Sequence, residues 1–213
     1  MGSSGAGKST LLYCLSGMDT LSGGKVLYQG QELGSLSEKK MAALRAGEFG
    51  FVFQQTHLVS NLTLFENVAV AGYLVREIPE KTVRERAESL LSQMHVEKAK
   101  DRLPYQASGG EAQRAAIARA MINQPRLLFA DEPTGALNRK NSEEVLGLLT
   151  SLNQEGQSIL MVTHDVKAAI RGNRILYLED GKILDEITLP SFDAQAARER
   201  EEKVSAWLAS LSW

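Results

Sequence analysis

Three short apolar runs stand out in the hydrophobic pattern of this chain, and each ends in polar side chains. The runs, with the polar residues that follow them, are 51–53 before Gln54, 127–130 before Asp131 and Glu132, and 159–162 before Thr163 and His164. Helical patterns occupy most of the intervening sequence. One predicted helix ends at about Ser16, and a second spans 63–94 with a break near Ile78 and Pro79. A third begins at Ser108, and a fourth spans 139–153. Continuous apolar strands that alternate with helices predict an α/β fold, with a mostly parallel sheet covered on both faces.

Two further segments have the pattern of antiparallel hairpins. Residues 25–33 predict a small hairpin with its turn near Gln29 and Gly30, and residues 173–187 predict a second one that turns at Asp180-Gly181. A charged helix closes the chain. The expected fold therefore also has a small antiparallel β part.

The polar residues after the apolar runs are expected to meet in one crevice, because open α/β sheets bind ligands at the carboxyl ends of their strands. Two adjacent carboxylates can divide roles there: Asp131 would hold the shell of a Mg²⁺ ion, and Glu132 would orient or deprotonate an attacking water. An acidic surface loop is the alternative, which the apolar strand directly before the pair disfavours. His164 and Gln54 complete the predicted crevice, although each alone reads equally well as a plain polar residue at a strand end.

The sequence opens on MGSSGAGKST, in which residues 2–9 fit the phosphate-loop pattern G-x-x-x-x-G-K-[ST]. The glycines let backbone amides point at phosphate oxygens, Lys8 can reach the β- and γ-phosphates, and the Ser9 hydroxyl can ligate Mg²⁺. The residues predicted to bind nucleotide here are Gly2, Ser3, Gly5, Gly7, Lys8, Ser9 and Thr10. A flexible Gly/Ser segment is the alternative, which the GKST ending and the apolar LLYCL run disfavour.

Ser108 begins a second candidate phosphate-binding element. It is placed as a helix N-cap with Glu111 at the third helical position, which is the pattern of a capping box. Gly109 and Gly110 weaken the first helical turn but leave its amides open to a closely approaching anion. A helix that is merely well capped is the alternative. Two such elements in one chain favour a shared nucleotide site.

Composition restricts the functional classes. The net charge of −2 over 213 residues gives no reason to expect a nucleic-acid partner, and no apolar run approaches the ~20 residues of a membrane span. The single cysteine, Cys14, cannot form a disulfide within the chain, which suits a reducing cytosol. Work at a membrane would therefore need another chain to supply the span.

Five motifs now stand in a familiar order: GSSGAGKST, a glutamine after GFVF, ASGGEAQR, LLFADEPTGALN and VTHD. In wording and order they resemble the ATP-binding cassette (ABC) ATPases, and the resemblance extends from Gly2 to about Leu189. The wording is most similar to the branch that serves lipoprotein-release, macrolide-export and peptide-antibiotic transporters. The ending, with Trp207-Leu208 and Ser212-Trp213, resembles the peptide-antibiotic group of Gram-positive bacteria.

The resemblance implies an ATP hydrolase that works with Mg²⁺ as a head-to-tail homodimer on a transmembrane permease, at the cytoplasmic face of a bacterial membrane. Lys8 and Ser9 of one copy would face Ser108, Gly109 and Gly110 of the other across ATP. It implies three catalytic residues: Glu132 as general base, His164 at the γ-phosphate, and Gln54 at Mg²⁺ or water. The single domain 1–213 would comprise a nucleotide-binding core (1–54 and 124–190), a helical subdomain (55–123) and a C-terminal helix (191–213).

Three features depart from the family pattern. Ala107 stands where the family usually has leucine, and Asn138 where it usually has an aspartate thought to couple the two sites. The family also has strands before the phosphate loop, with an aromatic residue that stacks on adenine, and this sequence begins one residue before the loop. We therefore expect an N-terminally truncated ABC fold without its first strands, with a loop tethered only through its helix and weak ATP binding.

Three functions remain open at this point. The first is the ATPase subunit of an exporter or antibiotic-resistance transporter, and the second is an ABC ATPase that drives a non-transporting membrane regulator of cell division or cell-wall enzymes. The third, a nucleic-acid or ribosome-acting ABC ATPase, is disfavoured because such proteins usually carry two cassettes or a long coiled-coil insertion. A GTPase is disfavoured because no N-K-x-D segment appears.

Overall fold

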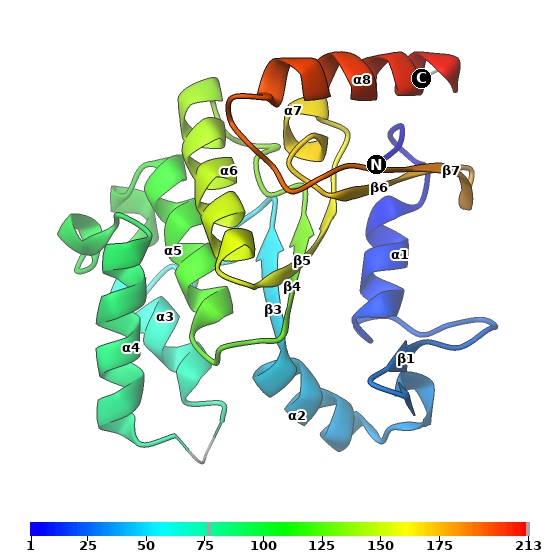
Figure 1. Cartoon of the computed structure of the whole chain (residues 1–213). Coiled ribbons are helices and arrows are strands. Elements are labelled where there is room, and N and C mark those ends of the chain that lie inside the picture. The colour runs from blue at the N-terminus through cyan, green and yellow to red at the C-terminus, as the bar shows by residue number, and fades with distance from the viewer. Residues whose placement is uncertain (76–77, 212–213) are drawn as a thin grey trace. The chain divides into compact units, whose positions relative to one another are not determined.

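The structure is a computed structural model that describes residues 1–75 and 78–211. Arg76 and Glu77 lie outside the described residues, as do Ser212 and Trp213 of the predicted C-terminal resemblance. The chain divides into two compact units, one of residues 13–160 and one that combines residues 1–12 with 161–213. Figure 1 shows the elements, which are described below unit by unit.

The sheet of the larger unit confirms the predicted parallel strands. Strand β3 (Phe49–Phe53) pairs in parallel with β4 (Leu127–Asp131), in a register that sets Phe53 opposite Asp131. The sheet order is β3-β4-β5, and the division between the units falls inside β5 (Ser158–Val162). Because β3 and β4 end level with each other, the residues that follow them lie at the same edge of the sheet.

Helices α3 (Leu64–Gly72), α4 (Glu80–Gln93) and α5 (Gly109–Met121) pack together in this unit, and α5 also contacts α6 (Arg139–Gln154) (Figure 1). The predicted helical break near Pro79 is confirmed, because α3 ends at Gly72 and Pro79 is the N-cap of α4. The predicted hairpin near Gln29 is also confirmed, as β1 (Leu27–Tyr28) and β2 (Gln31–Glu32). Helix α2 (Glu38–Glu48), which the sequence pattern did not predict, is capped by Ser37.

In the smaller unit, β6 (Arg174–Glu179) and β7 (Lys182–Thr188) form the second predicted hairpin. Its turn residues both have left-handed backbone angles, with φ of 47° at Asp180 and 73° at Gly181, as two-residue hairpin turns require. The short helix α7 (Val166–Ala169) follows β5. Helix α1 (Lys8–Leu15) begins in this unit, directly after the phosphate loop.

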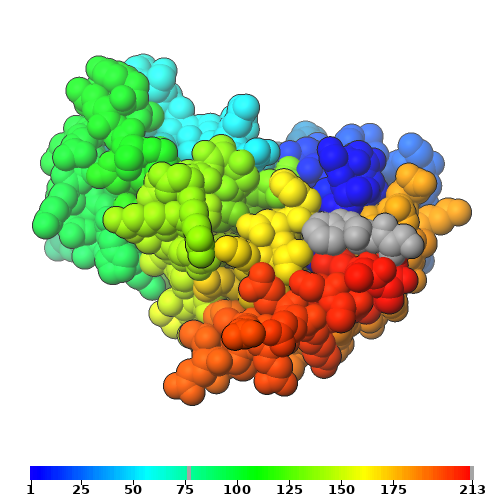
Figure 2. All heavy atoms as spheres, turned by 90° about the horizontal axis from the view of Figure 1, so that it is seen from above, coloured from blue at the N-terminus to red at the C-terminus, as the bar shows by residue number. Residues whose placement is uncertain are grey.

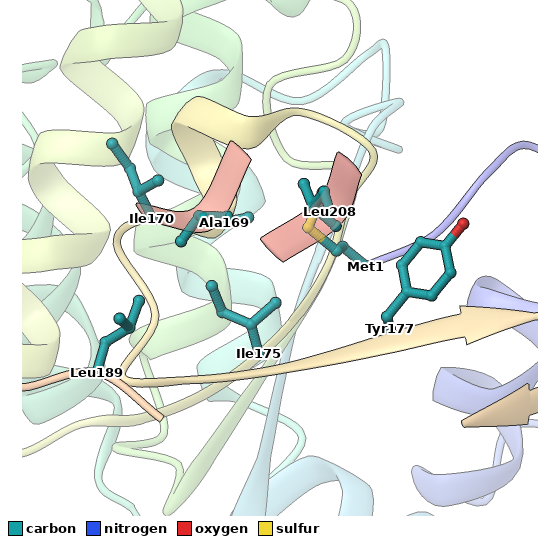
Figure 3. Close-up of a cluster of buried hydrophobic side chains, with 8 residues drawn as sticks. Met1, Ala169, Ile170, Ile175, Tyr177, Leu189 and Leu208 are labelled. Carbon is teal, nitrogen blue, oxygen red and sulfur yellow. The ribbon is translucent and has the colours of Figure 1, made fainter. Parts of the chain in front are cut away.

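The C-terminal helix α8 (Ala197–Ser210) packs against an apolar cluster of the smaller unit (Figure 3). The buried members of this cluster are Met1, Ala169, Ile170, Ile175, Tyr177, Leu189, Val204 and Leu208. Arg200 fixes the helix further, because its guanidinium donates hydrogen bonds to the carbonyls of Ile170, Pro190 and Gly172. Figure 2 shows α8, in red, at the surface beside the orange segment that leads into it.

Met1 is the residue that connects this cluster to the phosphate loop. Its amino group donates to the carbonyl of Leu176 at 2.5 Å, and its carbonyl accepts from the amide of Leu178 at 2.8 Å. Its side chain is buried in the cluster beside Leu208. The prediction that the loop is tethered only through its helix is therefore wrong, because β6 holds its first residue. The expectation of weak ATP binding stays a prediction.

Candidate functional site

The phosphate loop is closely fitted to the hairpin of the smaller unit. A Cβ atom on Gly2 would lie 2.0 Å from the carbonyl oxygen of Leu178, so this position admits only glycine. At the other side of the loop, the amide of Gly181 donates to the carbonyl of Ala6 at 3.1 Å. The loop is thus held by backbone hydrogen bonds to β6 and to the β6–β7 turn.

Within the loop, Gly5 and Gly7 have φ of 83° and 90°, the left-handed region that glycine reaches without strain. The Lys8 ammonium folds back and donates to the carbonyl of Ser3 at 2.9 Å. Lys8 and Ser9 are half-buried and Thr10 is exposed, at the start of α1. This is a compact loop with a cation beside it, which suits a phosphate ligand.

His164 belongs to the same unit and lies just after β5, as predicted. The neighbouring residues fix the backbone around it: the Thr163 hydroxyl accepts from the amide of Asp165 at 3.0 Å, and the Asp165 carboxylate caps α7. The imidazole is exposed. His164 is thus a surface side chain on a rigid backbone.

Three predicted residues come together in the larger unit, at the carboxyl edge of β3 and β4. Asp131 is the last residue of β4 and is buried, while Gln54 follows β3. The Gln54 side chain lies against the turn after β4, since a Cβ on Gly135 would fall 2.9 Å from its amide nitrogen. The Gly135 amide in turn donates to the carbonyl of Glu132 at 3.0 Å. The structure therefore brings Gln54, Asp131 and Glu132 to one place.

Glu132 has a left-handed backbone, with φ of 47°. A non-glycine residue in this region carries a cost of order 1–3 kcal/mol, and such residues concentrate at functional sites. Asp131 is the last residue of β4, whereas Glu132, the next residue, has this strained backbone. The two adjacent carboxylates thus belong to residues with different backbone conformations.

Tyr13 is a site residue that the sequence did not reveal. Its hydroxyl donates a hydrogen bond to Oδ2 of Asp131 at 2.7 Å, across 118 residues of sequence. Burial, with the adjacent Asp131 carboxylate, raises the pKa of Tyr13 to about 12, so the hydroxyl keeps its proton and remains the donor. No periodicity signals such a contact, because Tyr13 reads as one more member of an apolar helix.

Ser108 and Glu111 form the predicted capping box at the start of α5. The Ser108 hydroxyl accepts from the Glu111 amide at 3.2 Å, and the Glu111 carboxylate accepts from the Ser108 amide at 2.8 Å. The hydrogen bonds from Ser108 are the main reason that the pKa of Glu111 lies below its ordinary value, and Arg102, 3.3 Å away, adds to the effect. Gly109 is exposed, whereas Gly110 packs so closely on Asn141 that a Cβ would meet it at 2.6 Å.

The same helix also holds the segment that follows Gln54. The buried Gln113 amide donates to the carbonyl of Phe53 at 2.9 Å. The Arg119 guanidinium donates to the carbonyls of Thr56 and His57 at 2.6 Å and 2.7 Å. These contacts were also missed at the level of sequence. They tie the backbone on both sides of Gln54 to the helix that begins with the second glycine element.

The residues at these strand ends suit Mg²⁺ better than a transition metal. Their donors are carboxylate and amide oxygens, which Mg²⁺ prefers. Among the described residues there is no cluster of three or more His, Cys, Asp or Glu side chains that could enclose a metal.

Comparison with known proteins identifies a family for these features. The sequence matches the profile of the family described as "ABC transporter" over residues 1–135. It is 46% identical, over 88% of this chain and 84% of the relative, to the lipoprotein-releasing system ATP-binding protein LolD of Aquifex aeolicus. It is 40% identical to the bacitracin export ATP-binding protein BceA of Halalkalibacterium halodurans, over 88% of this chain and 74% of that protein.

The macrolide export ATP-binding/permease protein MacB of Hahella chejuensis is 38% identical along this whole chain, which spans only 34% of that longer protein. Among solved structures, the dimeric post-hydrolysis state of the ATP-binding cassette MJ0796 bound to ADP and Pi is similar, with a TM-score of 0.82 and 37% identity. It is matched over 90% of this chain and 84% of its own. In the described part of this protein, helices that combine the length and the apolar character of a membrane span are absent.

Proposed function

Because this chain belongs to the ABC transporter family and is an ATP-binding, ATP-hydrolysing subunit of that family, we propose that it powers an exporter of lipoproteins, macrolides or antimicrobial peptides. The observation that carries the proposal is the placement of Gln54, Asp131 and Glu132 at the level ends of two parallel strands. The similarity to LolD, MacB and BceA supports the exporter class.

Each predicted site residue has a role in this proposal. The loop residues Gly2, Ser3, Gly5, Gly7, Lys8, Ser9 and Thr10 bind the ATP phosphates. Glu132 accepts a proton from the attacking water, and its strained left-handed backbone is of the kind that concentrates at functional sites. His164 contacts the γ-phosphate and Gln54 orients water or metal.

A Mg²⁺ ion would complete the proposed site, where Ser9, Asp131 and Gln54 would hold it. The ion would neutralise charge that develops on the phosphate oxygens during transfer. What the chain contributes is orientation: the Tyr13 hydroxyl holds one oxygen of Asp131, and the Gln54 side chain rests against Gly135.

We further propose a homodimer in which Ser108, Gly109 and Gly110 of one copy contact ATP bound at Lys8 of the other. The dimeric state of the similar MJ0796 cassette supports this. So does the exposure of Ser108 and Gly109, which places the start of α5 at the surface, where an anion from outside the chain can approach it. The dimer would act at the cytoplasmic face of a bacterial membrane on a transmembrane permease, without nucleic acid.

The alternative is an ABC ATPase that drives a non-transporting regulator of cell division or cell-wall enzymes. The permease that works with this chain would distinguish the two. We expect that co-expression with that permease yields a membrane complex whose ATPase activity rises when an exported lipoprotein or antimicrobial peptide is added. Deletion of the genes for both this chain and the permease should make cells more sensitive to the exported antibiotic. A division defect with normal resistance, and no stimulation by any exported compound, would instead establish the regulatory role.

A further inference from the structure

We infer that Tyr13 is a positioning residue for the metal site, one that fixes the orientation of the Asp131 carboxylate through the hydrogen bond from its hydroxyl to Oδ2. The inference rests on the proposed function, in which Asp131 holds the shell of Mg²⁺. The hydrogen bond is short, at 2.7 Å, and joins two half-buried or buried side chains of the larger unit.

Three features of the structure support the role. Asp131 is only 8% exposed, so its carboxylate has little water to orient it, and the tyrosine hydroxyl provides a directional contact in its place. Tyr13 itself lies on α1, the helix that begins at Lys8 of the phosphate loop. Ser9, which is also a proposed metal ligand, lies on α1 four residues before Tyr13 and hence on the same helix face.

Loss of the Tyr13 hydrogen bond should change the affinity for the metal more than the affinity for the nucleotide. Mg²⁺ demands near-ideal octahedral geometry, so a carboxylate that rotates freely is a poorer ligand than one held in place. Partners that orient metal-binding side chains by hydrogen bonds typically contribute 10–100-fold to metal affinity. Tyr13 touches neither nucleotide nor water in this scheme, so its loss should leave the affinity for metal-free nucleotide unchanged.

The test uses Tyr13→Phe in the full chain, which removes one oxygen atom and keeps the ring. Mn²⁺ is titrated in the presence of the non-hydrolysable analogue adenylyl imidodiphosphate, and free Mn²⁺ is measured by electron paramagnetic resonance. We expect the Kd for Mn²⁺ to rise about tenfold. The affinity for the same analogue in EDTA should not change.

Tyr28→Phe is a matched control, because Tyr28 also donates to a carboxylate, Glu48, at 3.0 Å, and burial likewise raises its pKa. Its Mn²⁺ affinity should equal that of the wild type. An Asp131→Asn variant completes a cycle: adding Tyr13→Phe to it should cause no further loss of Mn²⁺ affinity, since the carboxylate to be oriented is already gone.

Three results would overturn the role of Tyr13. The first is a Mn²⁺ affinity of Tyr13→Phe within twofold of the wild type, and the second is an equal loss of affinity for the analogue in EDTA. The third is a further loss of Mn²⁺ affinity when Tyr13→Phe is added to Asp131→Asn. If one of these results is obtained while the wild-type chain binds both adenylyl imidodiphosphate and Mn²⁺, the proposed ATPase function remains intact. Failure of the wild-type chain to bind the analogue at all would instead reject the proposed function itself.

Discussion

Glu132→Gln is expected to abolish ATP turnover while ATP binding is retained. The amide has the shape of the carboxylate but cannot accept a proton from water, and loss of a general base commonly costs ~10²–10⁴ in rate. Glutamine keeps a side chain of the same length on the left-handed backbone at this position, so the turn to Gly135 should persist. Phosphate release and filter binding of labelled ATP measure the two properties in one preparation.

The dimer gives this prediction a second readout. A chain that binds ATP without hydrolysing it should accumulate as an ATP-bound dimer, visible by light scattering after size exclusion. Glu155→Gln is the matched control, because Glu155 is an exposed residue at the end of α6. This variant should hydrolyse ATP as the wild type does. Near-normal hydrolysis by Glu132→Gln would remove this residue from the catalytic role.

Gly2→Ala is expected to eliminate measurable ATP binding. The added Cβ would lie 2.0 Å from the Leu178 carbonyl oxygen, a distance at which the backbone of one segment has to move. Such movement would break the bond from the Leu178 amide to Met1 and withdraw Met1 from its apolar cluster. A released loop must be ordered again at each binding event, at ~1–2 kcal/mol per residue, so three residues reduce affinity by about a hundredfold or more.

Titration with a fluorescent ATP analogue measures the affinity, and thermal unfolding separates loss of the loop from loss of the fold. Gly147→Ala is the matched control, since a Cβ there has no neighbour within 4 Å and the residue lies inside α6. It should bind ATP normally and gain ~0.5–1 kcal/mol in the free energy of unfolding, because alanine is the better helix former. Wild-type affinity in Gly2→Ala would show that the fit of the loop against β6 is not needed.

Elements with a strong local pattern were predictable from the sequence. The three apolar runs became the strands of one sheet, and the Asp180-Gly181 dipeptide marked the turn of the separate β6–β7 hairpin, since both signals depend on residues close in sequence. The capping box of Ser108 and Glu111 was equally visible, because its two bonds join residues three apart. Helix α2 was missed, since its apolar face is weak and Met41 is its only buried residue.

Contacts between distant segments could not be predicted in the same way. The phosphate loop was expected to be tethered only through its helix, yet Met1 bonds to β6, 175 residues away. Tyr13 reaches Asp131 across 118 residues, and Arg119 reaches His57 across 62. Each of these residues fits the pattern of its own helix or loop, so the neighbouring sequence does not indicate that it also forms a hydrogen bond to a distant segment. Hydrogen bonds formed by the tertiary fold therefore decided which residues support the site.

A mixture of two damaged chains tests whether ATP is bound between two copies of this protein. Lys8→Ala removes the loop cation and Ser108→Arg blocks the exposed glycine element, so each variant alone should show no ATP-driven dimerisation or hydrolysis. In a mixed dimer, one site would combine the intact loop of one chain with the intact Ser108 of the other, and the second site would carry both changes. We therefore predict that mixing restores ATP binding at one site per mixed dimer. Mixtures that remain as inactive as the separate variants would contradict a site shared between two chains.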